Sequence, residues 1–193
     1  MGAGSAITVT VPVAGGTAPA IAGPTAVSAV SGTAFTTTVT TTGTPAPAVT
    51  ESGNLPAGVT FKDNGDGTAT LSGTPAAGSG GTYPLTITAT NSAGKATGQL
   101  TISVSQPPAI TSKASATAGL LTRFTFTVTS TGTPTAAISE TGALPLGFKF
   151  TPASNGTATI TGTALLPGVY HRTLTARNSA GTTTQPFTLT LTL

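Results

Sequence analysis

The acidic and amide side chains of one short segment could bind a cation. Asp63, Asn64 and Asp66 lie together in the sequence DNGDG. Calcium takes carboxylate and amide oxygens from loops of this kind, so these three residues are candidates for weak calcium binding. The spacing does not complete an EF-hand loop, and the corresponding segment later in the chain reads ASNG. The polar tip of a β-hairpin is therefore the competing interpretation.

The remaining polar side chains do not predict an active site. His171 is the single histidine and the chain has no cysteine, so a zinc site lacks its usual ligands. Glu51 and Glu140 occupy equivalent positions in two separate repeats, which excludes them as the paired acids of one site. We expect both glutamates at exposed strand ends and the histidine on the surface. We therefore predict a protein that is not an enzyme and has no cofactor.

Two long segments have nearly the same sequence. Residues 42–61 read TGTPAPAVTESGNLPAGVTF, and residues 131–150 read TGTPTAAISETGALPLGFKF, 89 positions later. A repeat of this length is too long for a solenoid unit and suits one β-sandwich domain. The sequence thus predicts a strand and linker segment at 1–17, a first domain at 18–105 and a second domain at 106–193.

The composition favours β-strands. Only 6% of the 193 residues are charged, whereas soluble proteins average roughly 25%. Threonine and valine, which prefer an extended backbone, are abundant, and the 25 glycines and 15 prolines supply turns. We predict an all-β fold of two tandem sandwiches with about seven strands each.

Alternation of apolar and polar side chains predicts the strands and their faces. In 83–90, tyrosine, leucine, isoleucine and alanine should face a core while the intervening threonines face solvent. The sequence NSAG at 91–94 and 178–181 should connect the last two strands of each repeat, and SQPP at 105–108 should be a short, stiff linker. The predicted strands are one between 19 and 30, then 34–40, 48–51, 58–61, 68–71, 82–90, 96–104, 122–129, 136–140, 147–150, 157–160, 169–177 and 183–193.

Charge and hydropathy exclude two classes of partner. The net charge is +3, but the seven lysines and arginines are spread along the chain. Nucleic-acid binding requires clustered basic residues, usually with stacking aromatic residues, so we expect no nucleic-acid partner. No apolar segment is long enough to cross a bilayer, so we expect no membrane insertion. The first residues lack a secretion signal, which leaves a piece of an exported protein or a chain not exported by that route.

Several short motifs recur at corresponding places in the two repeats. They are LPAG at 55–58 with LPLG at 144–147, GTP at 73–75 with GTA at 162–164, Tyr83 with Tyr170, and NSAG in both repeats. This pattern resembles the Ig-like, cadherin-like tandem repeats of bacterial surface and extracellular proteins, which also occur on phage virions. The resemblance implies two Ig-like β-sandwiches and a role as spacer, stalk or adhesive unit. The second repeat departs from the pattern at Ala164, where these repeats have proline.

The N-terminal segment is one candidate for contact with a partner. Ile7, Val9 and Val11 alternate with threonine in a strand-like sequence that is similar to the last strand of a preceding repeat. A lone strand cannot satisfy its own backbone groups. The segment is a remnant of a longer array, a strand that adds to the edge of another subunit or partner, or a strand that folds back on the first domain.

The far end of the second repeat is the other candidate. Leu165 and Leu166 replace two alanines of the first repeat, and Arg172 occupies an inward position that Leu85 holds in the first repeat. An arginine there either extends its head into water past the rim of the core or faces a partner domain. This end is the best candidate for a contact surface, and the competing interpretation is a loop folded back on its own core.

The sequence supports two hypotheses on function. The first is a stiff, non-catalytic rod on a bacterial cell surface or a phage virion, which contacts partners through edge strands and loop ends. The alternative is a carbohydrate- or ligand-binding accessory module of a secreted hydrolase, in which Tyr83 and Tyr170 stack on a glycan. The first hypothesis treats both tyrosines as core or corner residues. We favour it because the chain has no tryptophan and only 5% aromatic residues.

Overall fold

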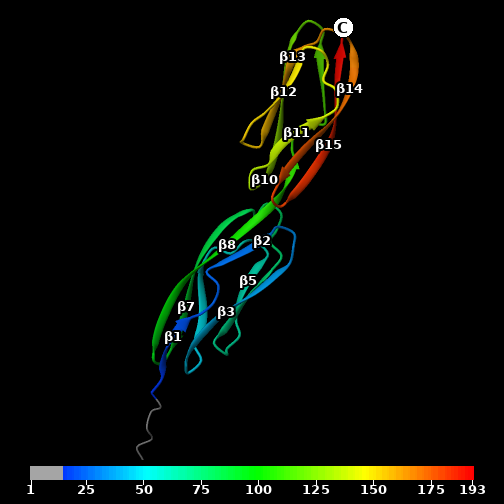
Figure 1. Ribbon diagram of the computed structural model, residues 1–193. Helices are drawn as coiled ribbons and strands as arrows, with labels where there is room; N and C mark the ends of the chain where they lie inside the picture. The colour runs from blue at the N-terminus through cyan, green and yellow to red at the C-terminus, as the bar shows by residue number, and fades with distance from the viewer. Residues whose placement is uncertain (1–14) are drawn as a thin grey trace, which may run out of the picture.

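The computed structural model describes residues 15–193 (Figure 1). These residues form fifteen strands and their connections, without a helix. The strands build two β-sandwiches placed end to end, which confirms the predicted all-β fold and the tandem arrangement. Within the described part of the chain, no helix is long and apolar enough to span a bilayer.

The first domain packs two sheets face to face. One sheet has the order β1 (Thr17–Ile21), β3 (Phe35–Thr44), β6 (Thr68–Gly73) and β5 (Val59–Asp63). The other contains β2 (Ala26–Val30), β8 (Gly94–Ile110), β7 (Gly81–Asn91) and β4 (Ala48–Gly53). The single opening strand expected between 19 and 30 is divided between the two sheets, because β1 pairs with β3 and β2 pairs with β8.

The second domain repeats this topology. One sheet joins β12 (Phe148–Pro152), β13 (Thr157–Thr163) and β10 (Arg123–Thr133) to the end of β8. The other has the order β11 (Ala137–Thr141), β14 (Gly168–Asn178), β15 (Gly181–Thr192) and β9 (Ser115–Gly119). Consequently β4 and β11 are edge strands at the same place in the two domains, and so are β5 and β12.

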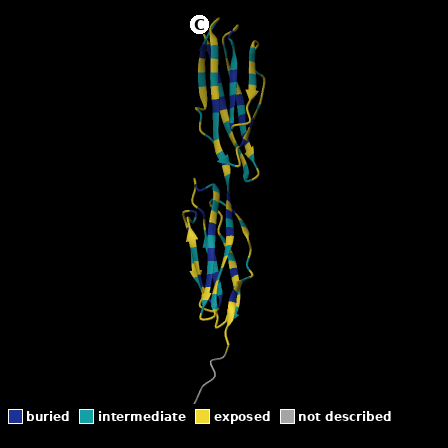
Figure 2. Ribbon diagram, turned by 90° about the vertical axis from the view of Figure 1, so that its left-hand side faces the viewer, coloured by how far each residue is buried: buried dark blue, intermediate teal, exposed yellow. Residues whose placement is uncertain are grey.

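Alternating side chains build each core, and Figure 2 shows the resulting bands of buried and exposed residues along the strands. In β7, Leu85, Ile87 and Ala89 are at most 2% exposed, which confirms the predicted faces. In the second domain, Phe187 is equally buried and packs against Phe126 with ring centroids 4.9 Å apart. Burial of one leucine, isoleucine or phenylalanine side chain stabilises the fold by about 1.5–3 kcal/mol.

Strand β8 differs from the expected linker. The sequence predicts a linker at 105–108, but these residues continue β8 without a break. The strand pairs with β7 as far as Val104 and then with β10 from Gln106 onward. Its two prolines cannot donate to a ladder, and they lie where the pairing with β10 shifts register. One strand therefore belongs to both sandwiches.

Side chains from neighbouring elements close the junction. The Asn178 amide donates to the backbone oxygens of Gln106 and Pro134, each at 2.8 Å. The hydroxyl of Thr183 donates to the backbone oxygen of Pro108 at 2.6 Å. Residue Gly80 of the first domain touches β10, since an added Cβ would meet the Thr133 hydroxyl at 2.6 Å. The two domains thus contact each other as well as sharing β8.

Candidate functional site

Loops at the far end of the second domain, opposite the junction, expose large apolar side chains. Leu165 and Leu166 in the β13–β14 loop are 47% and 64% exposed. Leu146 in the β11–β12 loop and Leu121 in the β9–β10 turn are 75% and 79% exposed. The β9–β10 turn adjoins the β13–β14 loop, because the Leu121 N–H donates to the backbone oxygen of Ala164 at 2.8 Å. The β11–β12 loop also adjoins the β13–β14 loop, since a Cβ added at Gly147 would lie 3.7 Å from the Leu165 side chain. We name the four leucines the apolar tip.

The first domain has small residues at each corresponding position, namely Gly32, Ala57, Ala76 and Ala77. Leu121 shows the difference most clearly, because its φ of 57° lies in the left-handed region that disfavours residues with a Cβ. Gly32 adopts φ 80° and makes the equivalent hydrogen bond to the next loop. The second domain therefore holds a strained leucine where glycine would be unstrained, and the leucine side chain faces solvent.

A basic groove adjoins the apolar tip. Arg123 and Lys149 line it with Leu165 and with threonines of β13, and its volume is about 470 Å³. The first domain has Ala34 and Thr60 at the two basic positions. Residues 106–193 contain five basic residues and one acidic residue, which gives a net charge of +4. Residues 1–105 contain two basic and three acidic residues, which gives a net charge of −1. The positive charge is thus concentrated in the second domain.

The head of Arg172 does not extend into water, contrary to one of the two expectations from the sequence. The residue is 4% exposed, and its guanidinium forms an ion pair with the Glu140 carboxylate on the neighbouring strand β11. Burial lowers the pKa of Arg172, yet the group stays charged because a guanidinium does not lose its proton in proteins. Glu140 is consequently not an exposed strand end, since its side chain is only 16% exposed.

The first domain has the acid of this pair without the arginine. Glu51 is half-buried, and its Oε2 has no hydrogen-bond partner among the described residues. The residue that corresponds to Arg172 is Leu85, which cannot neutralise a carboxylate. The acid is therefore common to both domains, and the arginine distinguishes the second.

Two of the candidate calcium residues form hydrogen bonds within the first domain. Asp63 Oδ1 accepts from the Gly65 N–H at 3.0 Å, and Asp63 Oδ2 accepts from the Val49 N–H at 3.1 Å. The Asn64 amide donates to the hydroxyl of Thr70 at 3.1 Å. Across residues 15–193, no three acidic, histidine or cysteine side chains gather as metal ligands. These contacts support the interpretation of the segment as a hairpin tip.

The third candidate, Asp66, caps the same turn. Its Oδ1 accepts from the hydroxyl and the N–H of Thr68 at 2.6 and 2.9 Å. These two bonds stabilise the charged carboxylate and lower the pKa of Asp66. Asn155 makes the same two bonds to Thr157 in the second domain. A neutral amide can therefore accept the same two hydrogen bonds as this aspartate.

The tyrosines and the histidine take structural positions. The Tyr83 hydroxyl donates to the backbone oxygen of Ser79 at 2.8 Å, and its ring packs against the first core. Tyr170 packs against the second core. His171 is exposed and lies 3.3 Å from the hydroxyl of Thr188. The Tyr83 contact is the hydrogen bond expected of a tyrosine corner.

The sequence did not predict that two asparagines of the NSAG turns would bind distant backbone groups. Asn91 donates to the backbone oxygens of Thr17 and Pro45, as Asn178 does to those of Gln106 and Pro134. Their occurrence in both repeats was the available signal, but the partners are distant in the chain. The segment with Ile7, Val9 and Val11 lies outside the described residues.

Both sandwiches match one family profile. The family described as Putative Ig domain matches residues 3–105 and 107–192. The chain belongs to the Putative Ig domain family. No curated protein matches the chain.

Solved structures of tandem Ig domains share the fold. A structure described as an anomalous substructure of Titin-A168169 has a TM-score of 0.64 and 13% identity, over 91% of this chain and 100% of that chain. An I-band fragment of titin has a TM-score of 0.59 and 18% identity, over 90% of this chain and 65% of that fragment. A structure of titin Ig tandem domains has a TM-score of 0.53 and 14% identity, over 92% and 98% of the two chains. At these identities the likeness concerns the fold alone.

Proposed function

We propose that this pair of Ig domains is a non-catalytic rod, displayed on a bacterial surface or a phage particle, which contacts partners through its apolar tip and its edge strands. The observation that carries the proposal is strand β8, which belongs to both domains. Bending the rod at the junction would break ladder hydrogen bonds, which a flexible peptide linker does not have.

The apolar tip is the end of the rod that we assign to a partner. Four leucines on adjoining loops present apolar surface that a domain could avoid, as the first domain does with glycine and alanines. Contiguous exposed apolar surface is typical of protein contact sites. The rod would hold this surface at a fixed distance from whatever anchors the first domain.

Edge strands offer a second mode of contact. A strand from another molecule can add to such an edge through main-chain hydrogen bonds. We propose residues 7–11, with Ile7, Val9 and Val11 alternating with threonine, as a segment that adds to an edge strand of another subunit. The alternative of a glycan-binding accessory module has no specific observation in its favour, because Tyr83 and Tyr170 pack against the two cores.

Photo-cross-linking tests the contact through the tip. A photo-reactive phenylalanine analogue replaces Leu166, and in a matched control it replaces Ala77, the corresponding residue of the first domain. On intact cells or purified particles of the source, we expect a discrete cross-linked product for Leu166 and none for Ala77. Equal products at both positions, or none at either, would contradict the assignment of the tip.

A further inference from the structure

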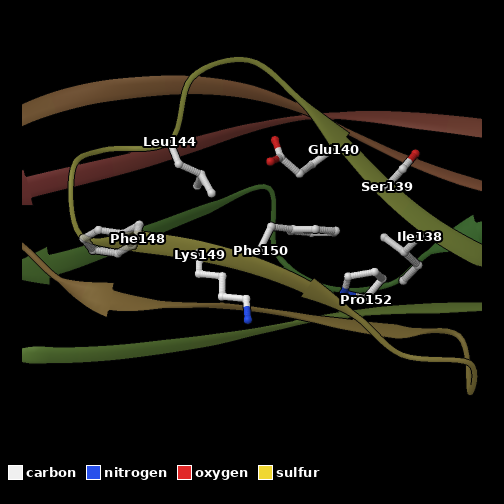
Figure 3. A pocket seen from close by; sticks show the side chains of 8 residues that line it. All are labelled: Ile138, Ser139, Glu140, Leu144, Phe148, Lys149, Phe150 and Pro152. Atoms are coloured by element: carbon white, nitrogen blue, oxygen red, sulfur yellow. The ribbon is translucent and has the colours of Figure 1, made fainter.

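We infer that the open edge between β11 and β12 binds an extended, acidic segment of a partner protein, which adds to β11 as a strand and inserts apolar side chains into a cleft. The inference rests on the proposed function, because it selects one edge of the rod and names the chemistry of its partner. Figure 3 shows the cleft from close by.

The cleft has apolar walls from two edge strands and the loop between them. Its volume is about 460 Å³, within the range of roughly 300–1,000 Å³ that is usual for binding clefts. Phe148 and Phe150 of β12, Leu144 of the loop and Ile138 of β11 supply the walls (Figure 3). Both phenylalanines are half-buried, so their remaining surface is accessible to an inserted side chain.

The first domain closes the same edge with a hydrogen bond. Asp63 on β5 accepts from the Val49 N–H on β4 at 3.1 Å and so bridges the two sheets. The corresponding residues of the second domain are Pro152 and Ile138. A proline side chain has no acceptor, so this bridge cannot form there. The exchange of Asp63 for Pro152 thus removes this bridge at the place where the cleft opens.

The outer edge of β11 offers backbone groups to an added strand. In an antiparallel ladder, alternate residues point both their N–H and C=O away from the neighbouring strand. The bond from Val49 to Asp63 identifies Val49 as such a residue in β4. Ile138 is the equivalent of Val49 in β11, and Glu140 follows two residues later. The backbone N–H and C=O groups of both residues therefore point away from β14. An incoming strand can pair with these groups beside the cleft.

The charges around the cleft select an acidic partner. Lys149 lines the cleft and also the basic groove that contains Arg123. The one acid at the cleft, Glu140, is neutralised by Arg172. Without Arg172, the Glu140 carboxylate would repel an acidic chain, and Glu51 has no such arginine in the first domain. The second domain thus combines an open edge with a positive surface, which favours association with negative charge.

A tryptophan reporter makes binding measurable, because the chain contains no tryptophan. The Phe150→Trp variant is titrated with a peptide of about nine residues, the length of a strand, in which valine and leucine alternate with aspartate. We expect a saturable change in emission. A peptide with lysine in place of aspartate should bind about tenfold or more weakly. Amide chemical shifts of Ile138 and Glu140 in the unsubstituted chain test the same contact without the reporter.

Two substitutions separate the cleft from its charge. Pro152→Asp copies the first domain and should close the edge and abolish peptide binding. Lys149→Glu, at an exposed position, should weaken binding of the aspartate peptide by about tenfold and strengthen binding of the lysine peptide. Thr60→Glu, the corresponding change in the first domain, should leave both affinities unchanged. If Pro152→Asp did not fold, the exposed Lys149→Glu change would still decide the outcome.

Each of three results with the designed peptides would overturn the inference. They are no saturable response from the aspartate peptide, equal binding of both peptides, and unchanged binding by folded Pro152→Asp protein. Tighter binding of a peptide that copies residues 5–13 of this chain would also overturn it, because the edge would then serve another subunit. Cross-linking at Leu166 does not involve this cleft, so failure here and failure of the proposed function are distinguishable.

Discussion

Leu121 occupies a backbone conformation that is unfavourable for leucine. Its φ of 57° corresponds to Gly32 at φ 80° in the first domain. We predict that Leu121→Gly raises the free energy of unfolding by about 0.5–1 kcal/mol, because relief of the left-handed strain exceeds the extra entropy of glycine in the unfolded chain. Guanidinium denaturation measures the change.

Leu146→Ala is the control for this prediction. Leu146 is equally exposed at the tip but has no positive φ, so we expect a change within about 0.5 kcal/mol. A lower stability of Leu121→Gly would mean that the leucine side chain contributes packing instead. The comparison separates strain from the loss of apolar surface.

Asp66 should make the first domain sensitive to acid. The Thr68 hydroxyl and N–H lower its pKa below the ordinary value of about 3.9. A lowered pKa adds stability that is present above pH 4 and is lost as the pH falls through the folded-state pKa. Asp66→Asn, which copies Asn155, should keep the fold and remove this part of the pH dependence.

Denaturation of wild type and Asp66→Asn at pH 7 and at pH 2 tests the prediction. The stability of the wild type relative to the variant should be higher at pH 7 than at pH 2. The reciprocal change Asn155→Asp should add a similar acid sensitivity to the second domain, because its hydrogen bonds to Thr157 match those of Asp66. A constant difference at both pH values would contradict the assignment.

The pair of Glu140 and Arg172 should behave as one unit. Arg172→Leu leaves the half-buried Glu140 without its counterion and should lower the free energy of unfolding by about 1–3 kcal/mol. Replacing both residues by leucine should recover most of that loss. A double-mutant cycle with Glu140→Leu measures the coupling, and additive effects would show that the ion pair contributes nothing.

At the scale of elements, the two asparagines of the NSAG turns donate equivalent hydrogen bonds to backbone oxygens at different places in the molecule. Asn178 binds the backbone of β8 at the junction, whereas Asn91 binds Thr17 at the outer end of the first domain. We predict that Asn178→Ala destabilises the second domain by about 1–3 kcal/mol and also loosens the junction. Asn91→Ala should destabilise the first domain without affecting the junction. Denaturation together with an interdomain distance measurement distinguishes the two effects.

The sequence predicts those features of the fold that depend on patterns along the chain and not on contacts between distant residues. The alternation in β7 identifies its core face, and the duplication identifies two equivalent domains. It does not predict that β8 crosses the boundary, because two prolines are typical of a linker and the register shift that accommodates them depends on β10. It does not pair Arg172 with Glu140, because that contact needs the register of β11 on β14. The cleft also escapes prediction, since the exchange of Asp63 for Pro152 is informative only once Val49 is known to face Asp63.

The whole molecule has two unlike ends. The β13–β14 loop, which carries Leu165 and Leu166 of the apolar tip, lies at the far end of the second domain, and the hairpin of β5 and β6 lies in the first domain (Figure 1). The net charges of the two domains have opposite signs, so the proposed acidic partner would be attracted to the second domain. The proposed rod depends on the junction being stiff.

A distance distribution between the two domains tests that stiffness most directly. Thr97 and Thr184 are exposed, occupy equivalent positions, and can be replaced by cysteine in a chain that has no other cysteine. Double electron–electron resonance between spin labels at these sites should give one narrow distribution, which broadens when glycines replace residues 106–108. A broad or multiple distribution in the chain with its own 106–108 sequence would contradict the rod.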